Sequence, residues 1–118
     1  MRIGLLGFGT VGRGVYELVS RRTDMEIGAV LCRRELALGD VRVTHDFADI
    51  LNDASIDTVV EAIGGVHPAC EYVRAAILAG KNVATSNKAL LAQDPGYVQM
   101  LETLPEDLRR AWLEGDWN

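Results

Sequence analysis

The sequence predicts an α/β domain in which helices cover both faces of a parallel β-sheet. Short, nearly continuous apolar runs of strand length alternate with segments whose apolar residues recur at helical spacing. Such runs are typical of parallel strands that are buried on both faces. A length of 118 residues with 48% hydrophobic residues provides for one modest core. The expected architecture is therefore a three-layer sheet and helix arrangement.

Five strands are expected, and each is short. The first ends at a cluster of glycines, and the third is the weakest of the five. The expected ranges are residues 2–6, 27–32, 41–44, 57–63 and 82–85.

The expected helices lie between these strands. One opens directly after the glycine cluster, and Asp46 is placed to cap a short helix that ends near residue 51. Pro68 suits the first turn of a helix that continues over 69–79, and Gly80 suits its C-terminal end. Ser86 can cap a further helix that includes residues 88–92.

The strongest functional signal is Gly7-Phe8-Gly9-Thr10-Val11-Gly12, which lies directly after the first strand and opens the first helix. In that context a GxGxxG pattern predicts a Rossmann-type, dinucleotide-binding fold. Gly7 permits the tight turn, Gly9 lets a pyrophosphate approach the backbone, and Gly12 lets helix and strand pack closely. N–H groups at the helix N-terminus would bind the phosphates. A glycine turn without a ligand is the alternative.

The end of the second strand predicts which dinucleotide binds, because the adenosine ribose lies there. An acid at this position would accept hydrogen bonds from the 2′-hydroxyl of NAD and repel a 2′-phosphate. This sequence instead has Arg33 and Arg34, followed by Glu35. The arginines favour NADP, with a guanidinium pairing the phosphate. A solvated arginine pair is the alternative, and Glu35 leaves the use of NAD open.

Two more loops follow the fourth and fifth strands, where open parallel sheets bind ligands. The first contains Gly64-Gly65 and the second contains Ser86-Asn87-Lys88. A lysine here can polarise a carbonyl or stabilise a developing alkoxide, as hydride transfer to an aldehyde requires. From spacing alone, an exposed lysine at a helix start is the alternative reading of Lys88.

Four other residues that could carry chemistry are expected to be structural. Glu61 lies inside the fourth strand, and His67 is a loop residue before a proline. Cys32 and Cys70 lie in apolar contexts without the spacing of a zinc site or a disulfide framework. We therefore expect buried free thiols and no metal site.

Composition argues against two classes of partner. The net charge is −5, and no Lys/Arg cluster is dense enough to indicate a nucleic-acid surface. The apolar stretches are far shorter than the ~20 residues needed to cross a bilayer, and no signal peptide is recognised. Neither nucleic acid nor a membrane is an expected partner, and the cytoplasm is the expected compartment.

Three segments resemble the N-terminal NAD(P)-binding domain of homoserine dehydrogenase: GLLGFGTVGRGV at 4–15, VVEAIGGVHPA at 59–69 and GKNVATSNKALLA at 80–92. They have the order and spacing of the family, and the resemblance covers residues 1–92. It implies the reversible NAD(P)H-dependent reduction of aspartate semialdehyde to homoserine. It also implies that Lys88 is the active-site lysine and that Asn87, Gly64 and Gly65 lie beside cofactor and substrate.

The composition changes near residue 92. Residues 93–118 contain both tryptophans and six acids against two bases, and Pro95 and Pro105 each predict the start of a short helix. The segment departs from the family, in which a second, substrate-binding domain follows, and 104–117 resembles part of phage terminase large subunits. We expect an NAD(P)-binding domain over 1–92, an unrelated acidic helical tail over 93–118, and a truncated or fused gene product.

Several functions follow from this division. The first is cofactor binding without turnover, because a small amino-acid aldehyde could react only if a substrate domain were supplied. The others are a non-catalytic scaffold that assembles through its tail, and another small-aldehyde or amino-acid dehydrogenase of the same fold. A parallel sheet cut short leaves an open edge, so a homodimer or a tail folded over that edge is expected.

Overall fold

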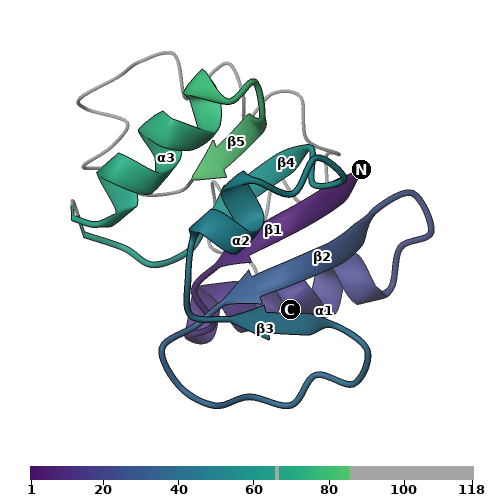
Figure 1. The fold of residues 1–118 in the computed structure, drawn as a ribbon. Coiled ribbons are helices and arrows are strands. Elements are labelled where there is room, and N and C mark those ends of the chain that lie inside the picture. Colours follow the sequence, from purple (N-terminus) through teal and green to yellow (C-terminus); the bar gives the residue numbers. More distant parts are fainter. Residues whose placement is uncertain (66, 86–118) are drawn as a thin grey trace.

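The structure contains a five-stranded parallel sheet, which confirms the predicted α/β class. The computed structural model describes residues 1–65 and 67–85. The strands lie in the order β3-β2-β1-β4-β5, and every neighbouring pair is parallel (Figure 1). Their bounds are β1 Arg2–Leu6, β2 Glu26–Leu31, β3 Arg42–Thr44, β4 Thr58–Glu61 and β5 Asn82–Thr85.

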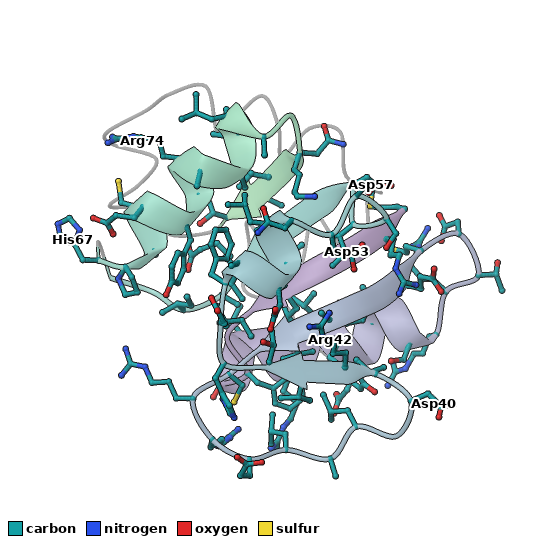
Figure 2. All side chains as sticks on the ribbon, viewed as in Figure 1. Asp40, Arg42, Asp53, Asp57, His67 and Arg74 are labelled. Atoms are coloured by element: carbon teal, nitrogen blue, oxygen red, sulfur yellow. The ribbon has the colours of Figure 1, made fainter. Side chains whose placement is uncertain are left out.

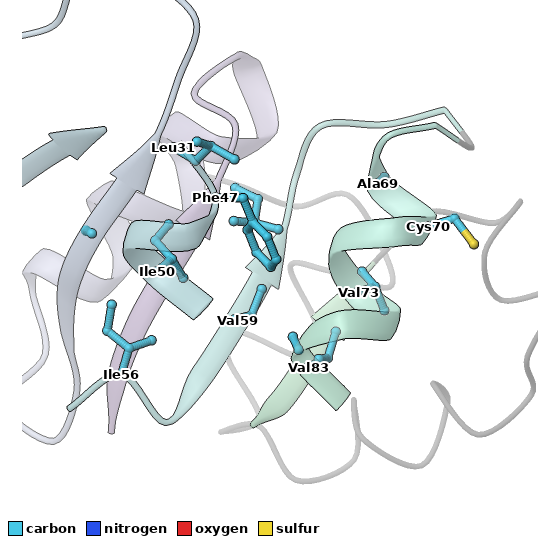
Figure 3. Packing of buried hydrophobic residues seen from close by; sticks show 12 residues of the cluster. Leu31, Phe47, Ile50, Ile56, Val59, Ala69, Cys70, Val73 and Val83 are labelled. Carbon is cyan, nitrogen blue, oxygen red and sulfur yellow. The ribbon is translucent and has the colours of Figure 1, made fainter. Parts of the chain in front are cut away.

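Helices cover both faces of this sheet, as predicted. They are α1 Thr10–Ser20, α2 Ala48–Leu51 and α3 Ala69–Leu78. Helix α1 packs Val15 and Val19 against one face of the sheet, and α2 and α3 cover the other face. Figure 3 shows this second core, where Ile50 of α2 and Val73 of α3 lie over Val59 of β4. Because successive strand residues point to opposite faces, both sets must be apolar, which accounts for the continuous apolar runs.

The helix ends follow the predicted signals closely. The Asp46 carboxylate accepts a hydrogen bond from the Ala48 N–H (3.0 Å), which confirms it as the cap of α2. Gly80 follows α3 with a φ of +83°, a conformation that favours glycine. Pro68 lies one residue before α3 rather than inside its first turn, and its carbonyl accepts the Tyr72 N–H. The helices expected at 88–92 and within 93–118 lie outside the described residues.

The strand order creates the place where a ligand can bind. From β1 the chain adds β2 and then β3 on one side, and it returns to place β4 on the other side of β1. The loops after β1 and β4 therefore leave the sheet in opposite directions, and open parallel sheets bind ligands in the crevice between such loops. We call the ends of the strands at this crevice the carboxyl edge.

Candidate dinucleotide-binding site

The glycine turn lies at the carboxyl edge, between β1 and α1, as predicted. Gly7 has a φ of +98°, and its N–H donates to the carbonyl oxygen of Leu31 in β2 (2.8 Å). A Cβ at Gly7 would lie 2.9 Å from the Ala62 carbonyl oxygen, and one at Gly12 would lie 2.2 Å from the Gly7 carbonyl oxygen. These two positions accept no side chain because the backbone itself occupies the space.

Gly9 differs from its neighbours, because a Cβ built on it would meet no atom of the described residues within 4 Å. Its φ of −82° is also open to any residue. Nothing inside the protein therefore requires glycine here, whereas a ligand that approaches the backbone would require it. This observation fits the predicted pyrophosphate contact.

The N-terminus of α1 presents unpaired donors beside Gly9. The Arg13 N–H donates to the Gly9 carbonyl oxygen (2.9 Å), so the N–H groups before Arg13 have no partner within the helix. No side chain caps this end, and no acid lies in its first turn. The free N–H groups and the positive end of the helix dipole are suited to a phosphate.

A cavity of about 430 Å³ adjoins the turn. Its lining comes from three parts of the fold that meet at the carboxyl edge: the glycine turn, the ends of β2 and β3, and the segment after β4. The lining residues are Gly7, Phe8, Gly9, Leu31, Cys32, Arg33, Arg34, His45, Ala62, Ile63, Pro68 and Tyr72. One side is thus basic and the other is apolar, and no Asp or Glu is among these residues.

The two arginines at the end of β2 have different surroundings. Arg34 donates from its guanidinium to the Phe8 carbonyl oxygen (2.7 Å), so it joins the β2 end to the glycine turn. It also lines a second, smaller hollow with Thr10 and Arg13. Both arginines are exposed, and both line the main cavity. The structure therefore brings Arg33, Arg34 and the glycine turn together, as the sequence predicted.

His45 is a cavity residue that the sequence reasoning missed. Its Nδ1 lies 2.6 Å from the Cys32 carbonyl oxygen and its Nε2 lies 3.3 Å from a Glu35 carboxylate oxygen. Both ring nitrogens face acceptors, which raises the pKa of His45. The Cys32 carbonyl makes the larger contribution and the Glu35 carboxylate the smaller one. Only its position after a short strand could have drawn attention to it.

We expect the stability contribution of His45 to be present at low pH and lost at high pH. Its pKa in the folded state lies above the ordinary value of 6.5. The contribution is therefore complete below about pH 6.5 and disappears as the pH rises through the folded-state pKa. Urea unfolding of the natural chain and of His45→Asn across this range measures the difference. In Glu35→Gln, NMR titration of the imidazole should give a smaller upward shift, and an identical shift would contradict this account.

The sequence did not predict that Tyr72 and Arg13 belong to the site, because their partners meet them only in the folded chain. The Tyr72 ring stacks on Phe47, with ring centroids 4.3 Å apart, and Tyr72 forms the apolar side of the cavity with Ile63 and Pro68. Arg13 lies over the Phe8 ring, 5.8 Å from its centroid. Helix spacing places both Tyr72 and Arg13 on helices, but it does not indicate the surface that each one faces.

Some of the remaining residues that the sequence singled out lie in the described part of the chain, and others do not. Gly64 and Gly65 follow β4 with φ values of +83° and +71°. His67 is exposed, contacts Glu71 and is directed away from the sheet (Figure 2), which agrees with a loop role. Ser86, Asn87 and Lys88 lie outside the described residues.

Neither the cysteines nor the other metal-ligating side chains of the described residues form a metal site. Cys70 is buried, and Cys32 is only partly buried beside the cavity. Within residues 1–65 and 67–85, no three His, Cys, Asp or Glu side chains gather to hold a metal ion. In the same part of the chain, no helix has the length and apolar character to span a membrane.

The fold and the glycine turn define a dinucleotide-binding domain of the Rossmann type. Comparison with known proteins then identifies the family, because the model of the homoserine dehydrogenase NAD-binding domain matches residues 7–113. The chain belongs to the homoserine dehydrogenase family through this domain. The match continues past residue 92, and the domain boundary expected there stays a prediction.

Individual relatives agree with this assignment. Homoserine dehydrogenase from Methylobacillus glycogenes is 41% identical over 106 residues, covering 78% of this chain and 26% of the relative. The enzyme from Lactococcus lactis is 40% identical over 108 residues, covering 78% and 25%. The crystal structure of the Thiobacillus denitrificans enzyme superposes with a TM-score of 0.71 at 32% identity, covering 85% of this chain and 26% of that one. The chain thus spans about a quarter of the length of these relatives.

Proposed function

We propose that this domain binds NADP in preference to NAD and presents it for hydride transfer between aspartate semialdehyde and homoserine. The observation that supports NADP is the basic wall of the cavity, where Arg33 and Arg34 lie beside the glycine turn. Among the described residues that line this cavity, none is an acid that would repel a 2′-phosphate. When bound, the nicotinamide supplies or accepts the hydride, and the residues of this domain hold the diphosphate and the adenosine.

The proposal assigns a role to each group of residues. Gly7, Gly9 and Gly12 shape the diphosphate turn, whose backbone includes Phe8, Thr10 and Val11. The arginine pair binds the 2′-phosphate. Gly64, Gly65, Ser86 and Asn87 lie along the nicotinamide half, and Lys88 stabilises the oxygen of the reacting aldehyde. Ser86, Asn87 and Lys88 lie outside the described residues, and their roles rest on the sequence.

Turnover is expected to need more than these 118 residues. Correct placement of two reactants can supply roughly 7 to 11 kcal/mol of a reaction barrier. We propose that the substrate-holding groups come from a separate domain, and that residues 1–92 act in the cytoplasm as the cofactor-binding unit of a homodimer.

Calorimetric titration with NADPH and NADH tests the proposal directly. We expect saturable binding of both, with NADPH bound at least about tenfold more tightly, a difference of about 1.4 kcal/mol. Equal affinities would overturn the preference for NADP. Reduction of aspartate semialdehyde by the chain alone, at about 1 to 10³ per second, would overturn the need for a further domain.

A further inference from the structure

Glu61 has a position at the carboxyl edge that the roles above do not use. It is the last residue of β4, and its side chain is 1% exposed. In the strand register it pairs with Leu6 of β1 on one side and with Thr85 of β5 on the other. This carboxyl group is therefore buried beside the point where the strand order reverses.

Both oxygens of the Glu61 carboxyl group accept hydrogen bonds. One oxygen accepts the N–H groups of Ile63 (2.7 Å) and Gly64 (2.9 Å), and the other accepts the Thr85 hydroxyl (2.6 Å). A buried carboxylate is costly unless such partners satisfy it. Hydrogen bonds to an ionised acceptor are also stronger than neutral ones. The two N–H bonds therefore fix the segment after β4, and the third bond joins the end of β5 to Glu61.

These bonds connect two parts of the site. Ile63 lines the main cavity, and Gly64 begins the pair of glycines with positive φ. Thr85 is the last residue of β5 and precedes the Ser86-Asn87-Lys88 segment in the sequence. A single side chain thus connects a residue of the cavity lining, Ile63, with the end of β5.

We propose that Glu61 is a positioning residue for the dinucleotide, which acts by holding Ile63, Gly64 and Thr85 in the geometry that the cofactor requires. This inference rests on the proposed function. Glu61 does not line the main cavity, so it acts through the segments it holds and not by contact with the ligand.

Two substitutions at Glu61 separate hydrogen bonding from charge. In Glu61→Gln the amide oxygen can still accept both N–H groups while its NH₂ donates to the Thr85 hydroxyl oxygen. In Glu61→Leu no acceptor remains. We expect Glu61→Leu to bind NADP⁺ about tenfold more weakly, corresponding to about 1.4 kcal/mol, and Glu61→Gln to stay within about threefold of the natural chain. Natural affinity in Glu61→Leu, or equal losses in both variants, would overturn the proposal.

A variant at Thr85 tests the second connection and decides the matter if Glu61→Leu does not fold. Thr85→Val keeps the shape of the side chain and removes the hydroxyl that Glu61 accepts. We expect this variant to bind NADP⁺ more weakly and to bind 2′,5′-ADP, which lacks the nicotinamide half, with unchanged affinity. General destabilisation would weaken the binding of both ligands. Equal losses of affinity for the two ligands, or no loss for either, would therefore overturn the proposal.

Asp53 provides a matched control at the opposite edge of the sheet. Its carboxylate also accepts a backbone N–H and a hydroxyl, both from Ser55 (2.9 and 2.6 Å), and it lies in the segment between α2 and β4 (Figure 2). Asp53→Ala should lower stability without changing either affinity. If the natural chain bound neither NADP⁺ nor 2′,5′-ADP, the proposed function itself would fail. If the natural chain bound NADP⁺ and the Glu61 variants bound it equally well, only the positioning role of Glu61 would fail.

Discussion

Replacing Gly9 with alanine is expected to weaken NADP⁺ binding on the order of a hundredfold, or about 2.7 kcal/mol, without destabilising the fold. A methyl group at this position meets no protein atom, and the backbone φ of −82° suits alanine. The free energy of unfolding should even rise by about 0.4–1 kcal/mol, because alanine restricts the unfolded chain. Calorimetry and urea unfolding of the same preparation measure the two quantities.

Gly12→Ala is the control for this prediction, because its methyl group would lie 2.2 Å from the Gly7 carbonyl oxygen. We expect this variant to lose both stability and affinity, since the backbone of the turn must move. If Gly9→Ala bound NADP⁺ as tightly as the natural chain, the diphosphate would not approach Gly9, and the assignment of the turn would be wrong.

Arg34→Asp is expected to reverse the preference between the two dinucleotides. A charge-assisted hydrogen bond contributes about 1.5–3 kcal/mol, so its loss should reduce NADP⁺ affinity roughly ten- to hundredfold, and the new carboxylate adds repulsion. The same carboxylate can accept hydrogen bonds from the 2′-hydroxyl of NAD⁺. NAD⁺ should therefore lose much less affinity, although the Phe8 carbonyl also loses its donor.

Two further variants complete this test. Arg21→Asp carries the same charge change at the far end of α1 and should leave the ratio of the two affinities unchanged. Arg33→Asp changes the other arginine of the pair and should have a smaller effect than Arg34→Asp, which also removes the bond to the Phe8 carbonyl. An unchanged ratio in both Arg33→Asp and Arg34→Asp would remove the basis for NADP preference.

Much of the fold could be predicted because its signals are local. Apolar runs buried on both faces indicate parallel strands, and Asp46 and Gly80 mark helix ends through hydrogen bonds and backbone angles within a few residues. The predicted fourth strand, 57–63, was too long: β4 ends at Glu61, whose side chain takes the N–H groups of Ile63 and Gly64. The apolar pattern alone does not reveal that a side chain, and not a neighbouring strand, accepts these N–H groups.

The parts of the site that lie within one short segment could be predicted from the sequence. The parts that form where distant segments meet could not. The glycine turn and the arginine pair each lie within a few residues, so their spacing was informative. The contacts of Arg34 with Phe8 and of His45 with Cys32 join residues 26 and 13 positions apart. Such contacts depend on strand order and register, which the sequence pattern does not specify in detail. The Glu61 interaction with Thr85 is of the same kind.

The bond from Arg34 to the Phe8 carbonyl has a consequence for engineering cofactor use. One guanidinium supports the glycine turn, and under the proposed function it also provides positive charge for the adenosine end, so the two tasks cannot be altered independently at this residue. A redesign toward NAD that replaces Arg34 must supply another donor to Phe8, or the turn loses its support. Changes at Arg33 leave that support in place, so a redesign that keeps the turn intact begins there.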